Sequence, residues 1–476
     1  MRFSKTILSV LAGATLAGCK TKAPPTTREV QRQSGVSRLD LARPWTAAPV
    51  STNTPEDNWL ATFQDPQLDA LVTEALAHNP DLRVAFATVE QAAEYVGLAR
   101  SELRPNVNLL GTGGFNMGGG DVSSALQGVS LGVSWEPDLW GRMRYARNAA
   151  QAGYASAKAD FEFARQSLAA NTGKCWFAAT AAWREQQISE DMVKAADGLL
   201  TLATQRQKVG PGSEQDIVLA RANLGNLQDT AKQTRLAYEQ SLRALELLVG
   251  RYPAAEIASR PDFGELPDDI PAGLPIQMLE RRPDMIAAER RVDAAFNRIG
   301  EAKAALLPRI FLNANLAVVK SDVLQLKKGF HNPVTGAGLK FIAPLYQGGA
   351  LETKIRIRTL EQKQALAEYA RLALRAIGDV EDALAEAQTL DDRESGLNQV
   401  LADTERALTL AQTSYRVGRG DLRAVQQQQL NVQTARMALL RVQSQQRIQR
   451  VNLHLALGGS FESPPGDLTF KTETPK

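Results

Sequence analysis

The sequence predicts a mixed α and β membrane protein. One chain would supply four strands to a transmembrane β-barrel and continue into very long helices. Three observations carry this prediction: an internal two-fold repeat spaced by about 203 to 208 residues, four short segments of alternating polarity, and two long Pro-free runs. A repeat this long is one duplicated half of a fold, not a small solenoid unit.

The two halves of the chain share turn and proline positions. The spacing between matching positions grows from about 203 to about 208 residues, so the second half has gained a few residues between its strands. The matching positions are Asn79–Asp81 with Arg282–Asp284, Leu103–Pro105 with Leu306–Pro308, Val209–Gly210 with Val417–Gly418, and Gly250 with Gly458.

The N-terminus is predicted to be a signal peptide over residues 1–18. Arg2 and Lys5 form a basic start, an apolar run follows, and Leu16-Ala17-Gly18 is a small-residue cleavage site before Cys19. This Leu-Ala-Gly-Cys run resembles the lipobox of bacterial lipoproteins, which implies that Cys19 is acylated. The alternative is an ordinary signal peptide with a chance cysteine. Lys20 after the cysteine implies delivery to the outer membrane.

The first element after the cysteine is predicted to be a lipidated tether over residues 19–58. Residues 20–58 are rich in Thr, Pro and Ala without periodicity, which suits an extended chain. The first structural repeat spans 59–250. It begins with a helix from Trp59 to about Arg104, broken at Asn79-Pro80, where proline fits a helix start but not an interior.

Four segments alternate between apolar and polar residues, as strands with two different faces do. They cover about 106–116 and 129–136 in the first repeat, and about 309–320 and 336–343 in the second repeat, which spans 276–458. Each is close to the 9–11 residues that cross a bilayer when tilted. The alternative is one face of a soluble β-sandwich.

Four strands cannot close a barrel, and an open sheet edge in lipid leaves backbone groups without partners. We therefore expect other copies of the chain to complete the barrel. The residues alone leave the number of copies open.

Two Pro-free runs are predicted to be single helices, from about Gly141 to Lys208 and from Gly349 to Tyr415. At 1.5 Å per residue, each helix would be about 100 Å long. A tight glycine turn follows each, and helices over roughly 214–249 and 421–457 return from the turns. Glycine permits the positive φ that ends a helix sharply.

Composition and motifs argue against other functions. Charged residues make up 22% of the 476 residues and the formal net charge is +3, so no nucleic-acid-binding surface is expected. Gly128–Gly132 matches the G-x-S-x-G nucleophile motif, but Ser130 lies within an alternating strand, so no enzyme is predicted.

The three histidines lack metal-ligand spacing, and solvated or capping roles are expected for them. The lone Cys175 is expected to be a small buried hydrophobe. We expect no cofactor and no metal.

Several stretches together carry a family resemblance. They include Trp135–Arg142, Gly273–Pro275, Leu279–Asp284 and Tyr415–Gly418. The chain closely resembles the TolC-like outer membrane factors of Gram-negative tripartite export systems, in the lipoprotein branch that serves RND multidrug efflux pumps. The resemblance extends from Trp59 to Gly459.

The resemblance implies a homotrimer with a 12-stranded transmembrane β-barrel and a long periplasmic α-helical barrel. Residues 20–58, the linker 251–275 and the tail 459–476 would form an equatorial belt. The implied partners are a periplasmic membrane fusion (adaptor) protein, an inner-membrane RND pump and outer membrane lipid. The implied activity is a passive exit duct for drugs or other small molecules.

The resemblance also assigns site residues at the periplasmic tip. The adaptor-contacting turns would be formed by Val209, Gly210, Gly212, Tyr415, Val417, Gly418 and Gly420. Asp421 is the nearest match to the acidic residues that narrow the entrance in this family, with Asp216 and Arg416 beside the turns. Two alternatives remain open: a type I protein secretion channel, and a periplasmic coiled-coil scaffold anchored only by lipid.

Overall fold

The computed structural model describes residues 21–41, 43–47, 57–113, 127–210, 212–258, 262–267, 270–320 and 333–462. The expected signal peptide, Cys19 and the chain after Glu462 lie outside these ranges. The chain divides into two compact units. The strand unit comprises Met1–Arg38, Ala87–Ala159 and Ile286–Arg371; the turn unit comprises Leu39–Phe86, Asp160–Met285 and Leu372–Lys476.

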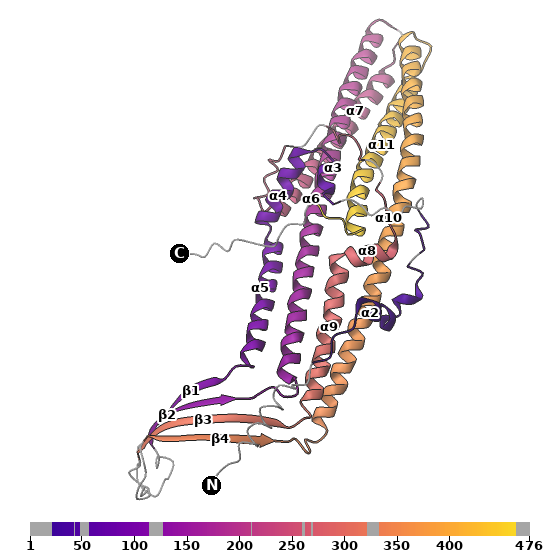
Figure 1. The fold of residues 1–476 in the computed structure, drawn as a ribbon. Helices are drawn as coiled ribbons and strands as arrows, with labels where there is room; N and C mark the ends of the chain where they lie inside the picture. Colours follow the sequence, from indigo (N-terminus) through magenta and orange to yellow (C-terminus); the bar gives the residue numbers. More distant parts are fainter. Residues whose placement is uncertain are drawn as a thin grey trace, which may run out of the picture. The chain divides into compact units, whose positions relative to one another are not determined.

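The strand unit contains one antiparallel sheet of four strands in the order β1-β2-β3-β4 (Figure 1). The strands are β1 Asn106–Thr112, β2 Gln127–Trp135, β3 Arg309–Lys320 and β4 Val334–Ile342. Each half of the chain contributes one pair of strands, and the pairing of β2 with β3 joins the two pairs. Within the described chain, β1 and β4 therefore each have one open edge.

The register of the sheet sorts the side chains onto two faces. Because directly opposed residues of an antiparallel sheet share a face, the pairs Leu109↔Leu131, Leu131↔Leu316 and Leu312↔Leu339 align one apolar face. The opposite face is mainly small or polar. It carries Asn106, Asn108, Ser130, Gly132, Ser134, Asn313, Asn315, Gly336 and Gly338. The alternation in the sequence thus corresponds to a two-faced sheet.

The strand unit also includes a short helix, α2 Thr27–Ser34, which corrects the expectation of an extended chain over residues 20–58. Thr26 and Glu29 form a capping box at its start, and Gly35 ends it with a φ of 84°. A 3-10 turn, η1 Val36–Arg38, follows. Thr27 also donates a hydrogen bond to Glu289 at 3.0 Å. The capping pattern was present in the sequence, but the surrounding Thr, Pro and Ala residues obscured it.

The chain forms two long helical hairpins, whose turns belong to the turn unit (Figure 1). Helix α6 Arg142–Lys208 leads to α7 Glu214–Val249, and α10 Ala350–Arg416 leads to α11 Leu422–Ala456. These bounds lie within a residue or two of the predicted ones. The other helices are α3 Trp59–Thr62, α4 Pro66–His78, α5 Pro80–Ser101, α8 Pro275–Arg281 and α9 Pro283–Ala304.

The helix predicted from Trp59 to Arg104 has a second break that the prediction missed. Gln64 has a positive φ of 48°, and Asp65 accepts hydrogen bonds from the amides of Gln67 and Leu68 as the N-cap of α4. The Asp65 carboxylate also accepts a hydrogen bond from the indole of Trp176 at 2.9 Å. Asp followed by Pro is a helix-start signal that could have located this break.

His454 corrects the expectation that the histidines are solvated or capping. The residue is 5% exposed, and its ring stacks on Trp59 with centroids 5.9 Å apart and planes at 22°. Cys175 is only half-buried, rather than buried as expected.

Part of the 251–275 linker is held within the turn unit by contacts with two arginines. The Phe263 ring lies 4.9 Å from the guanidinium of Arg447 and 5.6 Å from that of Arg184. Arg447 also donates to the Gly264 carbonyl at 2.8 Å. Burial lowers the pKa of Arg447 to about 10.

No helix in the described ranges is both long enough and apolar enough to cross a membrane.

Candidate functional site

The two helical hairpins turn through the same backbone pattern. Gly210 has a φ of 101° and donates to the Gln207 carbonyl at 3.2 Å. Gly418 has a φ of 80° and donates to the Tyr415 carbonyl at 3.1 Å. The prediction that these two glycines adopt positive φ to end their helices is confirmed. Such a turn closes a helix because glycine has no Cβ to clash.

The second glycine of each turn is needed for a different reason. Gly212 and Gly420 are not among the described glycines with positive φ. A Cβ at Gly212 would lie 2.5 Å from the Gln207 nitrogen, and one at Gly420 would lie 2.9 Å from the Tyr415 nitrogen. The glycines therefore let the chain return close against the end of the preceding helix.

The turns expose apolar side chains to solvent. Val209 is 79% exposed and Val417 is 63% exposed. Each valine stands next to a glycine with no side chain, so its methyl groups project without cover from a neighbour. Exposed valines at the two turns are suited to contact another protein.

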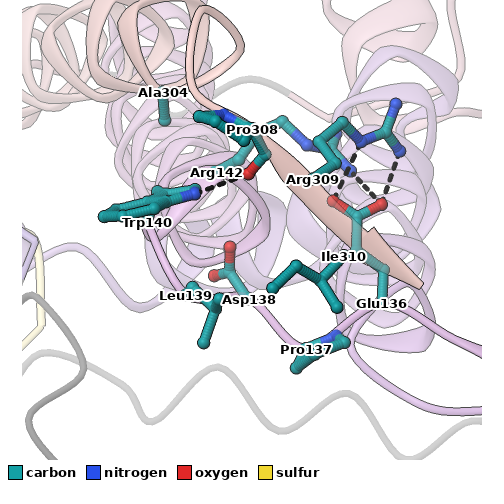
Figure 2. A pocket seen from close by; sticks show the side chains of 10 residues that line it. All are labelled: Glu136, Pro137, Asp138, Leu139, Trp140, Arg142, Ala304, Pro308, Arg309 and Ile310. Carbon is teal, nitrogen blue, oxygen red and sulfur yellow. Dashed lines mark hydrogen bonds and ion pairs between the residues drawn. The ribbon is translucent and has the colours of Figure 1, made fainter. Parts of the chain in front are cut away.

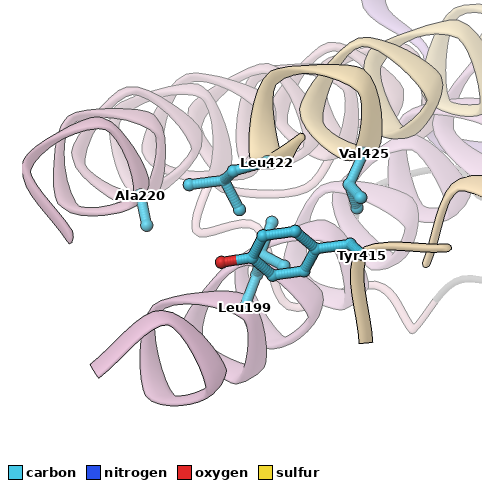
Figure 3. Packing of buried hydrophobic residues seen from close by; sticks show 5 residues of the cluster. All are labelled: Leu199, Ala220, Tyr415, Leu422 and Val425. Carbon is cyan, nitrogen blue, oxygen red and sulfur yellow. The ribbon is translucent and has the colours of Figure 1, made fainter. Parts of the chain in front are cut away.

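The two hairpins share a small core close to the turns. Tyr415, only 2% exposed, packs there with residues from all four helices (Figure 3). The cluster consists of Leu199, Ala220, Tyr415, Leu422 and Val425. Tyr415 was predicted to contact an adaptor, but its burial gives it a packing role within the chain.

Arg206 joins the hairpins and was missed by the sequence analysis. Its guanidinium donates to the Tyr415 carbonyl at 2.5 Å and lies 4.2 Å from the centre of the Tyr415 ring. Burial raises the pKa of Tyr415, and Asp216 adds to the rise while Arg206 opposes it. Nothing in the local sequence marks Arg206, because its partner lies 209 residues away.

The predicted aperture residues lie at the starts of the returning helices and the end of α10. Asp421 accepts a hydrogen bond from the Arg423 amide at 3.2 Å as the N-cap of α11. Ser213 is the equivalent cap of α7, accepting from the Asp216 amide at 3.1 Å. Arg416 is exposed at the last position of α10. The Asp421 carboxylate thus caps helix α11, which is a structural role separate from the predicted narrowing of the entrance.

In the strand unit, an ion cluster fixes the ends of the strands (Figure 2). The Glu136 carboxylate accepts hydrogen bonds from Arg142 at 3.3 Å and from Arg309 at 3.0 Å. Trp140 donates its indole N–H to the Pro308 carbonyl at 2.6 Å. These residues line a small pocket. The contacts connect the end of β2, the start of α6 and the start of β3.

Helix α6 begins at a carboxylate cap beside this cluster. Asp138 accepts hydrogen bonds from the amides of Met143 at 3.2 Å and Arg144 at 2.9 Å. Its charge also pairs with the Arg144 guanidinium at 3.1 Å. The stretch Trp135–Arg142 therefore contains the residues that end strand β2 and begin helix α6.

A sheet with one exposed apolar face, together with long helical hairpins that end in glycine turns, defines the class of outer membrane channel proteins. The family model described as outer membrane efflux protein matches residues 71–251 and 274–459. The chain belongs to this family.

Individual relatives resemble nearly the whole chain. The cation efflux system protein CusC of Escherichia coli O6:H1 is 26% identical over 467 residues, covering 96% of this chain and 99% of its own. The probable efflux pump outer membrane protein TtgC of Pseudomonas putida KT2440 is 27% identical, covering 88% and 89%. The solved CmeC outer membrane channel of Campylobacter jejuni has a TM-score of 0.81 at 24% identity, covering 88% and 91%.

The prediction of an outer membrane efflux channel is thereby confirmed, as is its location in the outer membrane. Members of this family are channels rather than enzymes, in agreement with the expected lack of catalysis. Among the described residues, no group of three His, Cys, Asp or Glu side chains could hold a metal ion.

Proposed function

We propose that three copies of the chain form one passive exit duct for small molecules. Each copy would add four strands to a 12-stranded barrel in the outer membrane, and its long helices to a tube through the periplasm. Cyclic symmetry makes this assembly simple, because the same edge pairing recurs between every two neighbours. The duct would have no catalytic site of its own.

The open-edged, two-faced sheet carries this proposal. Leu109 is 72% exposed and Leu339 is 62% exposed, and both lie on the apolar face. A face this apolar is stable against lipid, while Asn and Ser side chains on the opposite face suit a wet lumen. The open edges of β1 and β4 require further strands, because lipid offers backbone groups no hydrogen bonds.

The turns would form the docking tip for a periplasmic adaptor protein. Val209 and Val417 offer exposed apolar contacts on backbone that Gly212 and Gly420 hold close to the helix ends. An inner-membrane RND pump would supply the energy through that adaptor. The names of the relatives, an efflux pump outer membrane protein and a cation efflux system protein, support membership in such a multi-part assembly.

Purified protein in planar lipid bilayers tests the proposed duct. We expect discrete single-channel conductance steps, and a trimer band in gel electrophoresis that collapses to monomer on boiling. A chain that forms stable trimers but gives no conductance, even when the turn contacts are loosened by Arg206→Ala, would contradict the duct. A periplasmic scaffold predicts that result.

A further inference from the structure

The strands of the sheet contain no acidic residue. Their sequences carry three cations, Arg309, Lys320 and Lys340, and no Asp or Glu. The register places Arg309 and Lys340 on the polar face, since Arg309 pairs with Ile342 and Lys340 with Phe311. The described charge within the strands on that face is therefore entirely positive.

Arg309 is already balanced by a carboxylate. It pairs with Glu136 at 2.5 Å, and its guanidinium lies 4.8 Å from the centre of the Phe311 ring. The negative charge of Glu102 also attracts the Arg309 guanidinium. Arg309 therefore holds the strand ends together and contributes little free positive charge to the face.

Lys340 differs from Arg309 in having no such partner among the described residues. Its side chain is exposed, and no carboxylate of the described residues forms an ion pair with it. Its two neighbours along β4 on the same face are Ile342 and Gly338, and an added Cβ at Gly338 would meet no atom within 4 Å. Lys340 is therefore exposed beside Phe311, with the uncharged Asn313 and the already balanced Arg309 at the diagonal positions of the same face.

We propose that Lys340 makes the polar face an anion-attracting site that raises the local concentration of small anions, such as chloride and carboxylates. The inference rests on the proposed barrel, in which this face lines the pore and each copy contributes one Lys340. A lone charge acts over about 10 Å at 0.1 M salt and about 30 Å at 0.01 M, so the effect should grow as salt is lowered.

A reporter cysteine can measure this local potential without requiring conduction. Asn313 lies diagonally across from Lys340 on the same face, about 7–8 Å away. Asn313→Cys, in a Cys175→Ser background and in lipid vesicles at about 10 mM salt, would react with an anionic and a cationic methanethiosulfonate reagent. The same chain without the reporter gives the background rate.

The measured quantity is the ratio of the anionic to the cationic reaction rate. We expect Lys340→Gln to lower this ratio about fivefold, since one unit charge at such a distance in water acts oppositely on the two reagents. Lys340→Arg should preserve the ratio. The matched control Lys194→Gln, whose charge lies on α6 in an ion pair with Asp191, should also leave it unchanged.

One outcome would contradict the role of Lys340, and another would contradict the proposed barrel. An unchanged ratio in Lys340→Gln, with Asn313→Cys still reactive, would overturn the role of Lys340 alone. A second reporter, Leu339→Cys, lies on the apolar face and should react far more slowly in vesicles. If it reacts as fast as Asn313→Cys, the proposed barrel itself is wrong.

Discussion

His454 is held neutral by its surroundings. Burial first, and the nearby Arg450 second, lower its pKa to about 3. An unfolded histidine titrates near 6.5, so between these two pKa values the unfolded chain binds more protons than the folded chain. The contribution of neutral His454 to stability is therefore complete above pH 6.5 and is lost as the pH falls toward 3.

We expect His454→Leu to remove this pH dependence. Between pH 6.5 and 4.5, the wild-type free energy of unfolding should fall by about 2–3 kcal/mol more than that of the variant. Helical circular dichroism during denaturation at the two pH values measures the difference. Equal losses in the two proteins would show that His454 is protonated within the folded chain at little cost.

Arg206 should stabilise the ends of the hairpins, whereas the Tyr415 hydroxyl should not. Arg206→Ala removes a hydrogen bond to a helix-end carbonyl and a cation–π contact, which together contribute about 1–2 kcal/mol. The Tyr415 hydroxyl has no hydrogen-bond partner among the described residues, so Tyr415→Phe should be nearly neutral. Amide hydrogen exchange over residues 199–222 provides the measurement. Equal protection in Arg206→Ala and wild type would refute the stabilising role.

Neither of these residues could be assigned from the sequence. The partner of Arg206 is 209 residues distant, and His454 lies far along the chain from Trp59. Such contacts depend on how helices far apart in the sequence pack, and one sequence does not specify this. By contrast, the positive φ of Gly210 and Gly418 follows from local backbone sterics, and the prediction for them was correct.

At the scale of elements, local signals located nearly every long helix. The returning helix α7 has the predicted bounds, 214–249, because a serine cap begins it and Gly250 ends it in the left-handed conformation. Helix α2 and the break before α4 were missed for a different reason. Both depend on short capping motifs: Thr26 lies in a segment without periodicity, and Asp65 lies inside a segment that was predicted to be helical.

The second turn offers a test at this scale. Gly418→Val places a β-branched residue at a φ of 80°, which costs of order 1–3 kcal/mol in backbone strain. We expect impaired export, measured as retention of a fluorescent efflux substrate in cells, with trimer assembly unchanged on gels. Normal export by this variant would show that the turn is not part of the docking tip.

Gly396→Ala is the matched control for Gly418→Val. Gly396 lies within α10, has no atom within 4 Å of an added Cβ, and lacks a positive φ. Alanine there should be neutral or stabilising by about 0.5–1 kcal/mol, because glycine is unfavourable in a helix interior. Export by this variant should match the wild type.

For the whole molecule, the sequence and the sheet predict two independent attachments to the membrane: an acyl chain on Cys19 and an integral barrel. The lipid would hold the chain only at its first mature residue, whereas a closed barrel is held by its entire apolar face. Removing the lipid should therefore leave the protein in the membrane.

Cys19→Ala tests this expectation, with Cys175→Ala as the control that retains the acylation site. We expect Cys19→Ala to lose labelled palmitate yet remain in the membrane fraction after alkaline or high-salt washing, and to need detergent for extraction. Cys175→Ala should keep both the label and the membrane location. Release of Cys19→Ala as a soluble bundle would instead identify the chain as a lipid-anchored scaffold, because a barrel with an exposed apolar face cannot leave lipid without another apolar environment to cover that face.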